Sequence, residues 1–255
     1  MKFEYLKTRS EGGIVGITLN LPPLNVLTIS MMEEMITALK WAKEEPGALV
    51  VIDAEGKAFS AGVDVADHTP DKVGQMIDVF DRLFLAMSEI PKPLVAVVNG
   101  AALGGGYEIV LACDIVVASE KAKLGQPEIN VGVFPPVACY LLPNLLSWPR
   151  ALELLLSGEV INATRAEQMG LVNKVIPAAD DFAQGVSDFL KKFLVQSPVV
   201  LALTKKAALA GLRKNLVDGL KDIDEIYLKE LMPTNDAVEG LQAFMEKRRP
   251  VWQGK

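Results

Sequence analysis

The chain has 255 residues, half of them hydrophobic, and a formal net charge of −6 at pH 7. This length and composition predict one domain with a buried hydrophobic core and an appended subdomain. The acidic balance argues against a broad nucleic-acid-binding face, which needs a basic stripe. Because no run of 18 apolar residues and no N-terminal signal region are apparent, a soluble, cytoplasmic protein outside the membrane is expected.

Strand patterns dominate the first half of the chain. Residues 14–21 alternate between apolar and polar, and three continuous apolar runs are typical of buried strands at 48–53, 94–99 and 114–119. Two helical patterns separate these strands, at 30–45 and 72–90. Ser30 and Glu33 are predicted to form a capping box at the first of these helices.

Helical patterns dominate the second half, at 149–156, 164–169, 182–194, 201–212, 216–231 and 237–248. Thr164 with Glu167 is predicted to form a second capping box, and Thr234 to cap the last helix. Strand–helix units followed by helices alone indicate an α/β core at 1–196 and a C-terminal helical subdomain at 197–255, with the boundary at Ser197.

Two cysteines and one histidine limit the metal and redox chemistry. Cys113 and Cys139 stand in apolar stretches, so both are predicted to be buried free thiols rather than a disulfide. His68 has too few partners to build a zinc site, and no metal site is expected.

Three consecutive glycines, in 99-NGAALGGGYEIVLACDI-115, follow a predicted strand and precede a helical pattern. A helix start offers free N–H groups, and glycine lets another molecule approach the backbone closely. This favours a site for negative charge, either a phosphate or a developing oxyanion. Neither a Walker motif nor G-x-G-x-x-G is present, which disfavours a phosphate loop. The alternative is that the glycines only allow tight packing of helix against strand.

A second strand-end turn lies in 56-GKAFSAGVDV-65. Its small residues predict a sharp turn that leaves the Val63 N–H unpaired. Two such turns, each with one free N–H, can converge on one carbonyl oxygen, which is what an oxyanion hole requires.

Two glutamates complete the candidate site. Glu108 follows the glycines, and Glu128 lies 20 residues later in the loop 125-GQPEINVGVFP-135. That separation is enough to cross one strand and return to the same sheet edge. Glu128 is either a solvated loop charge or a buried acid with a raised pKa. Two carboxylates at one site can perform general acid–base chemistry on a water.

These segments together resemble the crotonase (enoyl-CoA hydratase/isomerase) superfamily. The resemblance rests on KAFSAGVDV, NGAALGGGYE, ACDIVVASEKAKLGQPEINVGVFP, ATRAEQMGLVNKV at 163–175 and EGLQAFMEKR at 239–248. These blocks span nearly the whole chain. The resemblance implies a ββα spiral with two nearly perpendicular sheets and a C-terminal helical part that forms homotrimers or dimers of trimers. Asp114, in the third block, is expected to be structural.

The resemblance also implies an activity, the hydration of an α,β-unsaturated acyl-CoA thioester through an enolate. The Val63 and Gly105 N–H groups would form the oxyanion hole. Glu108 would take a proton from water, and Glu128 would supply one to Cα. No cofactor is expected, since CoA is part of the substrate.

Further residues are implied to bind CoA: Lys57, Ala61, Phe244 and Lys247. The two lysines are equally compatible with ordinary solvated surface positions.

One segment departs from the family pattern. Where hydratases commonly continue with P-G-A-G-G, this chain has 134-FPPVACYLLPNLL-146. Prolines are expected to stiffen this loop. The acyl pocket is predicted to include Tyr107, Phe134, Pro136, Val137 and Tyr140. A cyclic substrate, cyclohexa-1,5-diene-1-carbonyl-CoA, is one interpretation, and a general hydratase with a repacked loop is the other.

Two other functions are weighed against hydration. An enoyl-CoA isomerase needs only one glutamate, and some relatives are RNA-binding proteins without activity. The presence of both Glu108 and Glu128 favours a hydratase, and the acidic charge disfavours RNA. His68 follows the first turn and is interpreted as a solvated residue rather than an acyl contact.

Overall fold

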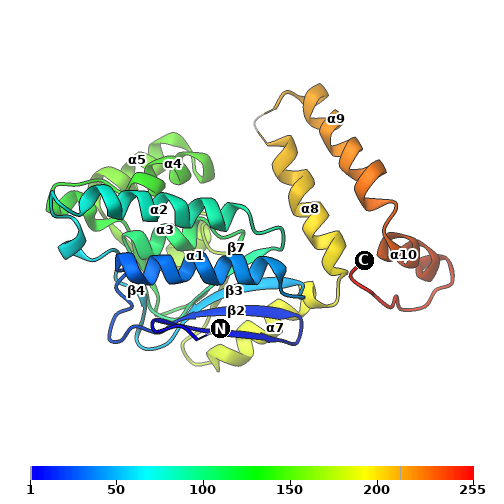
Figure 1. Cartoon of the computed structure of the whole chain (residues 1–255), viewed down its shortest axis with the longest axis horizontal. Coiled ribbons are helices and arrows are strands. Elements are labelled where there is room, and N and C mark those ends of the chain that lie inside the picture. Colours follow the sequence, from blue (N-terminus) through cyan, green and yellow to red (C-terminus); the bar gives the residue numbers. More distant parts are fainter. Residues whose placement is uncertain (1, 213) are drawn as a thin grey trace.

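The computed structural model describes residues 2–212 and 214–255. It is an α/β structure with two mixed sheets. Figure 1 shows the strands enclosed by helices at one end of the molecule, and the last helices of the chain projecting from the other end.

The larger sheet has six strands in the order β1-β2-β3-β5-β7-β10. Their bounds are β1 (Leu6–Glu11), β2 (Ile14–Leu19), β3 (Leu49–Ala54), β5 (Leu94–Val98), β7 (Ile115–Ser119) and β10 (Lys174–Ile176). β1 and β2 form an antiparallel hairpin, and every other neighbouring pair is parallel. The four strands predicted from the sequence are confirmed as β2, β3, β5 and β7.

The smaller sheet has four strands of three residues each, in the order β4-β6-β8-β9. They are β4 (Ala58–Ser60), β6 (Ala101–Leu103), β8 (Lys123–Gly125) and β9 (Val160–Asn162). The sequence did not predict them, because three residues are too few to show a period of two. β4 pairs in parallel with β6, so the two glycine-containing turns follow neighbouring strands at the same sheet edge.

The chain repeats one unit: a strand of the larger sheet, a strand of the smaller sheet, then helix. The first unit is β3, β4 and α2 (Val73–Ser88), and the second is β5, β6 and α3 (Gly105–Leu111). In the third, β7 and β8 lead to a 3-10 helix, η2 (Pro127–Val131), and to α4 (Pro136–Leu145) and α5 (Trp148–Ser157). This is the expected ββα succession.

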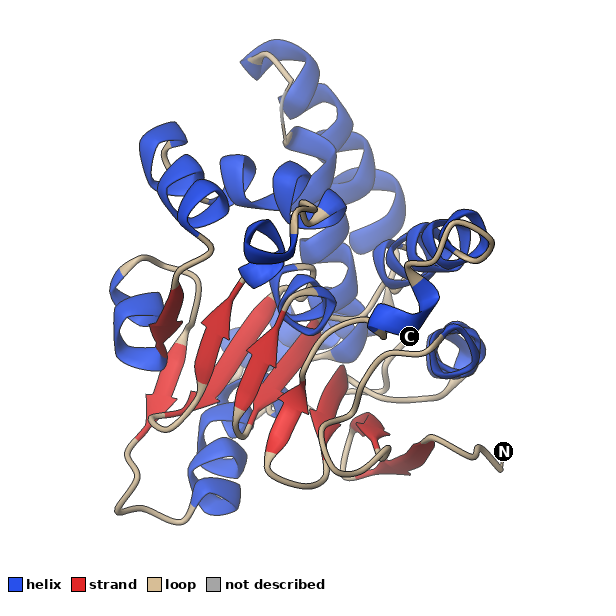
Figure 2. Ribbon diagram, turned by 90° about the vertical axis from the view of Figure 1, so that its left-hand side faces the viewer, coloured by secondary structure: helices blue, strands red, loops and turns tan. Residues whose placement is uncertain are grey.

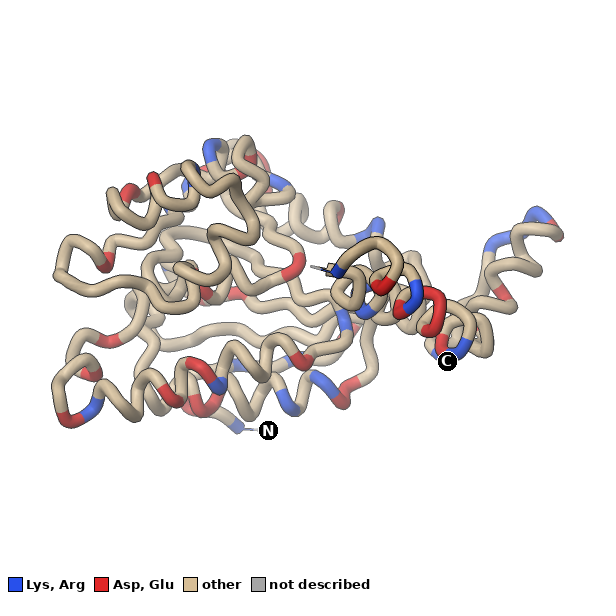
Figure 3. Tube along the Cα trace, turned by 90° about the horizontal axis from the view of Figure 1, so that it is seen from above, with Lys and Arg blue, Asp and Glu red and all other residues tan. Residues whose placement is uncertain are grey.

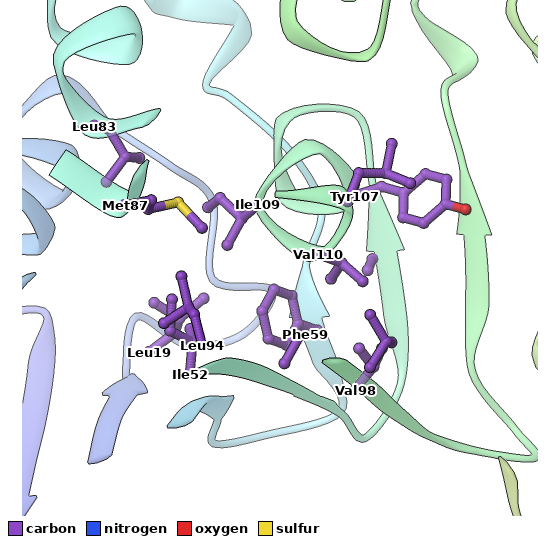
Figure 4. Close-up of a cluster of buried hydrophobic side chains, with 14 of the residues drawn as sticks. Leu19, Ile52, Phe59, Leu83, Met87, Leu94, Val98, Tyr107, Ile109 and Val110 are labelled. Carbon is purple, nitrogen blue, oxygen red and sulfur yellow. The ribbon is translucent and has the colours of Figure 1, made fainter. Parts of the chain in front are cut away.

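Helices cover both faces of the larger sheet (Figure 2). On one face α1 (Ile29–Glu44) and α2 pack over the main core, part of which is drawn in Figure 4. On the other face α7 (Phe182–Leu194) covers a smaller cluster. The two faces alternate along β3, where Val50 and Ile52 enter the main core and Leu49 and Val51 the smaller cluster.

Both predicted capping boxes are wrong. Thr28, not Ser30, caps α1 and accepts from the Met31 N–H at 3.1 Å. Asn162, not Thr164, caps α6 (Ala163–Gln168). A cap needs an extended backbone, and Ser30 and Thr164 already lie inside their helices. The predicted cap at Thr234 is confirmed, since its hydroxyl accepts from the Ala237 N–H at 3.1 Å.

The C-terminal region is helical, as expected. It contains α8 (Pro198–Gly211), α9 (Leu216–Ile226), the π-helix η3 (Tyr227–Leu231) and α10 (Asn235–Met245). Lys205 of α8 forms a 2.6 Å ion pair with Asp114, whose carboxylate also accepts from the Leu94 N–H at 2.7 Å. Asp114 therefore joins β5, β7 and α8, which is the structural role expected for it.

No single helix among residues 2–212 and 214–255 is long and apolar enough to cross a membrane. By length and composition alone, α7 and α8 pass the same test as a bent pair, with 86° between them.

Candidate active site

Of the three consecutive glycines, Gly104 forms the turn between β6 and α3, and Gly105 and Gly106 begin α3. This turn is tightly enclosed. Gly104 has φ of +52°, and a Cβ there would lie 2.7 Å from Glu128 Oε1. A Cβ on Gly105 would lie 2.7 Å from Val63 Cγ2. The glycines therefore bring the Val63 turn and the Glu128 carboxyl together at the start of α3.

The second turn, at Gly62 and Val63, packs directly against the first. Gly62 has φ of +101°, and a Cβ on it would lie 3.6 Å from the Gly105 nitrogen. The Leu27 N–H donates to the Gly62 carbonyl at 2.9 Å, and the Asp64 N–H donates to the Leu27 carbonyl at 3.0 Å. These bonds fix the turn without using the Val63 N–H. Within the described part of the chain, neither Val63 nor Gly105 donates its N–H to a protein acceptor.

Glu108 of α3 is 2% exposed. Its Oε1 accepts a 2.7 Å hydrogen bond from the Ala138 N–H in the first turn of α4. Burial raises the pKa of Glu108 to about 8, although the Ala138 and Val137 N–H groups oppose the rise, and the charge of Glu128 adds to it. Glu108 is therefore a buried acid whose proton is held near neutral pH.

Glu128 lies on η2 and is half-buried. Burial raises its pKa, while a backbone N–H of its own and the charge of His68 act in the opposite direction. With the side-chain amide of buried Gln126 oriented so that its nitrogen faces Glu128, this nitrogen lies 3.1 and 3.2 Å from the two carboxyl oxygens and 3.3 Å from the Gly104 carbonyl oxygen. Its two N–H groups can donate to two of these three acceptors. Of the two interpretations left open, the buried acid is the one the structure supports.

These groups form one constellation around Gly104. Two carboxyls with raised pKa values lie next to two free N–H groups. Such an arrangement can stabilise negative charge on one atom and exchange a proton at its neighbours. No cluster of three metal-ligating side chains occurs in the described ranges.

The segment expected to be a stiff loop is largely a helix, and that expectation is wrong. Pro136 occupies the first turn of α4, where a missing N–H costs nothing because it has no intrahelical partner. The helix start places the Ala138 N–H on Glu108. Val137 and Pro136 are half-buried beside it, as a pocket wall requires.

The three other residues predicted to line the acyl pocket differ in their exposure. Tyr107 is 1% exposed and belongs to the main core, as Figure 4 shows. Phe134 and Tyr140 are 69% and 58% exposed in the single chain. Cys139 is exposed rather than buried, contrary to expectation, whereas Cys113 is half-buried.

The residues predicted to contact CoA are not brought together within one chain. Lys57 and Ala61 are exposed and flank β4, Lys57 before the strand and Ala61 after it, next to the Val63 turn. Phe244 and Lys247 are exposed near the end of α10. Figure 1 shows α10 at the opposite end of the molecule from β4. His68 is exposed, as expected, and its Nδ1 lies 2.9 Å from the Asp64 carbonyl.

Ala138 and Gln126 were not singled out from the sequence, yet they contact the two carboxyls. For Ala138 a signal was present, because a proline pair followed by apolar residues is a helix-start pattern. For Gln126 the only signal was its place beside Pro127-Glu128, and a single amide predicts no partner.

Known proteins resemble the chain along its whole length. The sequence profile of the enoyl-CoA hydratase/isomerase family matches residues 9–255. The cyclohexa-1,5-dienecarbonyl-CoA hydratase of Thauera aromatica is 34% identical over 246 residues, 96% of this chain and 95% of that protein. A probable enoyl-CoA hydratase of Bacillus subtilis is also 34% identical, over 95% of this chain and 96% of its own.

Solved structures give the same result. The crystal structure of an enoyl-CoA hydratase from Bacillus anthracis superposes with a TM-score of 0.92 at 31% identity, covering 99% of this chain and all of that one. With the two turns and two carboxyls in place, the chain belongs to the enoyl-CoA hydratase/isomerase family and is a hydro-lyase of the enoyl-CoA hydratase type.

Proposed function

We propose that the chain adds water across the double bond of an α,β-unsaturated acyl-CoA at the constellation around Gly104, and that the acyl group is cyclohexa-1,5-diene-1-carbonyl. The observation that carries the reaction is the pairing of Glu108 and Glu128, both with raised pKa values, beside two free N–H groups. An isomerase would need only one of these carboxyls.

The Val63 and Gly105 N–H groups bind the thioester oxygen. Negative charge develops on this oxygen when a nucleophile adds at Cβ and the electrons move toward the carbonyl. Two N–H groups already fixed by the turns need no rearrangement to stabilise it. Gly62 and Gly104 are required because their positive φ angles form the two turns.

The two carboxyls hold one water and one proton between them. In the reactive form of the pair the shared proton lies on Glu128, so that Glu108 is ionised. Glu108 then takes a proton from the water while the oxygen of the water bonds to Cβ. Protonated Glu128 then gives its proton to Cα, and the enolate electrons form the Cα–H bond. The product is the 3-hydroxyacyl thioester, and proton exchange with solvent restores the pair. The reaction uses only groups of this chain, with CoA as part of the substrate.

The cyclic acyl group is inferred from α4. Its first turn puts Pro136 and Val137, both half-buried, where the family commonly has glycine. A helical wall with larger side chains fits a rigid planar ring, which loses little conformational freedom on binding. The resemblance to the Thauera aromatica enzyme is consistent with this choice.

We expect kcat/KM for cyclohexa-1,5-diene-1-carbonyl-CoA to exceed that for crotonyl-CoA at least ~10-fold, or ~1.4 kcal/mol. Steady-state hydration assays with both thioesters measure this ratio. Equal values, or a preference for crotonyl-CoA, would leave a general hydratase with a repacked wall.

The CoA site is completed in an oligomer. Lys57 and Ala61 bind CoA from one protomer, and Phe244 and Lys247 of a neighbouring protomer reach the adenine end. The C-terminal helices expose apolar side chains that suit such an assembly: Leu209, Leu212, Leu216, Val217, Leu220 and Leu228. We expect a homotrimer or a dimer of trimers, and a monomer in sedimentation velocity would contradict this.

RNA binding receives no comparable support. Figure 3 shows Lys and Arg side by side with Asp and Glu on the outer helices, rather than gathered in one stripe. Filter binding of RNA at two salt concentrations, run beside the hydration assay, separates the two activities.

A further inference from the structure

A second cavity lies on the other face of the larger sheet, between β1–β3, β5 and α7. Its volume is about 560 Å³, enough for a small organic molecule. One wall is apolar and includes Val51, Val97, Val186 and Leu190. Ala183 on α7 lines the exposed rim. Glu108 points to the opposite face, toward α4, so this cavity is separate from the candidate active site.

The cavity has a polar end at the carboxyl ends of the strands. Arg9 donates to Asp53 Oδ2 at 2.6 Å and to Thr18 Oγ1 at 2.8 Å. The charge of Asp53 is therefore already paired. Its second oxygen, Oδ1, is buried and has no hydrogen-bond partner among the described residues.

Asn99 supplies a second acceptor of the same kind. Its amide nitrogen donates to the carbonyls of Ala54 at 3.2 Å and Gly56 at 2.9 Å, which fixes the orientation of the side chain. Its Oδ1 is buried and also has no partner in the described ranges. Because Asn99 bonds to the residue after Asp53, the two acceptors belong to adjoining strand ends, β3 and β5, and both residues line the cavity.

A buried acceptor without a hydrogen-bond partner carries a free-energy cost, and a ligand that donates a hydrogen bond to it removes this cost. The chemistry of the ligand follows from the two ends of the cavity. Its head must donate hydrogen bonds, because Asp53 Oδ1 and Asn99 Oδ1 can only accept. Its head need not be cationic, because Arg9 already neutralises Asp53. Its body must be apolar, to lie along Val97 and Val186.

We propose that this cavity binds a small neutral amphipathic molecule through a primary amide or hydroxyl head at Asp53 and Asn99. Asn99 ties the end of β5 to the chain between β3 and β4, and Gly100 follows it into β6. A ligand there contacts the strand ends that lead into both turns of the active site.

The test uses hexanamide as the probe and hexanoate as its matched anion, with Kd from ligand-observed NMR titration of the full chain. Ala183→Phe fills the rim of the cavity. Gln184→Phe places the same ring on the next, outward-facing residue of α7. Circular dichroism and the hydration assay verify that both variants fold.

We expect hexanamide to bind wild type and Gln184→Phe equally, and Ala183→Phe at least tenfold more weakly. We expect hexanoate to bind wild type at least tenfold more weakly than hexanamide, because a carboxylate repels the two acceptors. Absence of hexanamide binding would mean that water alone fills the cavity and would overturn the proposal. Equal binding of hexanamide to the two phenylalanine variants would also overturn it, as would binding of hexanoate to wild type as tight as that of hexanamide. A change of oligomeric state in Ala183→Phe would mean that the cavity is an interface between protomers and would overturn the proposal as well.

Discussion

The Glu108 carboxyl is held in surroundings that favour its protonated form. It is 2% exposed, and the Ala138 N–H donates to its Oε1 at 2.7 Å, with the Val137 N–H also acting on the carboxyl. These backbone N–H groups do not replace the solvation lost on burial, so the pKa rises to about 8. This raised pKa has consequences for both stability and catalysis.

Stability is expected to depend on pH through Glu108. A folded pKa of about 8, above the ordinary 4.5, means that the unfolded carboxyl ionises first. The contribution of the folded Glu108 carboxyl to the free energy of unfolding is therefore fully present below about pH 4.5 and is lost as pH rises through 8. Glu108→Gln removes this loss. We expect the variant to gain more than ~1 kcal/mol of unfolding free energy relative to wild type between about pH 5 and pH 8.

Urea unfolding of both proteins at these two pH values measures the difference. An identical gap between variant and wild type at both values would mean that Glu108 is not a buried acid.

Catalysis is expected to fail at alkaline pH. The pair needs one proton, and burial raises the pKa of Glu108 to about 8, so the pair loses its last proton above that pH. We expect kcat/KM for hydration to fall tenfold per pH unit well above 8. The full pH profile of kcat/KM is the measurement, and a constant rate through about pH 9 would contradict the assignment.

At the scale of elements, the turn before α3 can be tested through Gly104. A Cβ at this residue meets both a φ of +52° and the Glu128 carboxyl at 2.7 Å. Gly12, in the β1–β2 hairpin, has a similar φ of +59° but open space around it. We expect Gly104→Ala to lower kcat at least ~10²-fold by displacing Glu128. Gly12→Ala should keep kcat and lose only ~1 kcal/mol of stability.

Steady-state kinetics and thermal unfolding of the two variants give the comparison. Loss of stability without loss of kcat in Gly104→Ala would mean that the turn does not position Glu128.

The predictability of most elements followed their length, but β1 (Leu6–Glu11) was not predicted, because its six residues are mostly polar and show no apolar alternation. β2, β3, β5 and β7, and helices such as α7 at 182–194, have enough residues to show their period, and the sequence predicted them. The strands of the smaller sheet have three residues each, so the sheet that aligns the two turns was not visible in the pattern. α4 was missed because its prolines suggested a loop, although proline at the first position of a helix is favourable.

The candidate site was predictable only in part. Glu108, Glu128, Val63 and Gly105 were named from the sequence and converge in the structure. Tyr107 was assigned to the pocket because it adjoins Glu108, but neighbours on a helix point about 100° apart, and Tyr107 enters the core.

At the scale of the whole molecule, Asp236 ties the end of the chain to the helical region. It is 1% exposed and accepts from the Ser197 hydroxyl at 2.6 Å and from the Gln253 and Gly254 N–H groups at 2.7 and 3.0 Å. Burial raises its pKa, but these hydrogen bonds outweigh burial and lower it. Its removal should loosen the region that is proposed to complete the CoA site.

We expect Asp236→Asn to cost ~1–3 kcal/mol of unfolding free energy, because an amide cannot accept at both positions. Asp224→Asn, at an exposed position of α9, is the matched control and should change stability little. Calorimetry compares the two, and equal effects would mean that the tie contributes nothing.

The central claim is that the two glutamates together perform water addition. Glu108→Gln, Glu128→Gln and the double variant keep the shape of the site and remove one or both carboxyls. Measured kcat for hydration of cyclohexa-1,5-diene-1-carbonyl-CoA and crotonyl-CoA should fall ~10²–10⁴-fold in each single variant. The kcat of the double variant should be little lower than that of the less active single variant, since the two carboxyls act as a unit. Binding of the acyl-CoA should persist in all three. Near-wild-type turnover in either single variant would contradict the two-glutamate account.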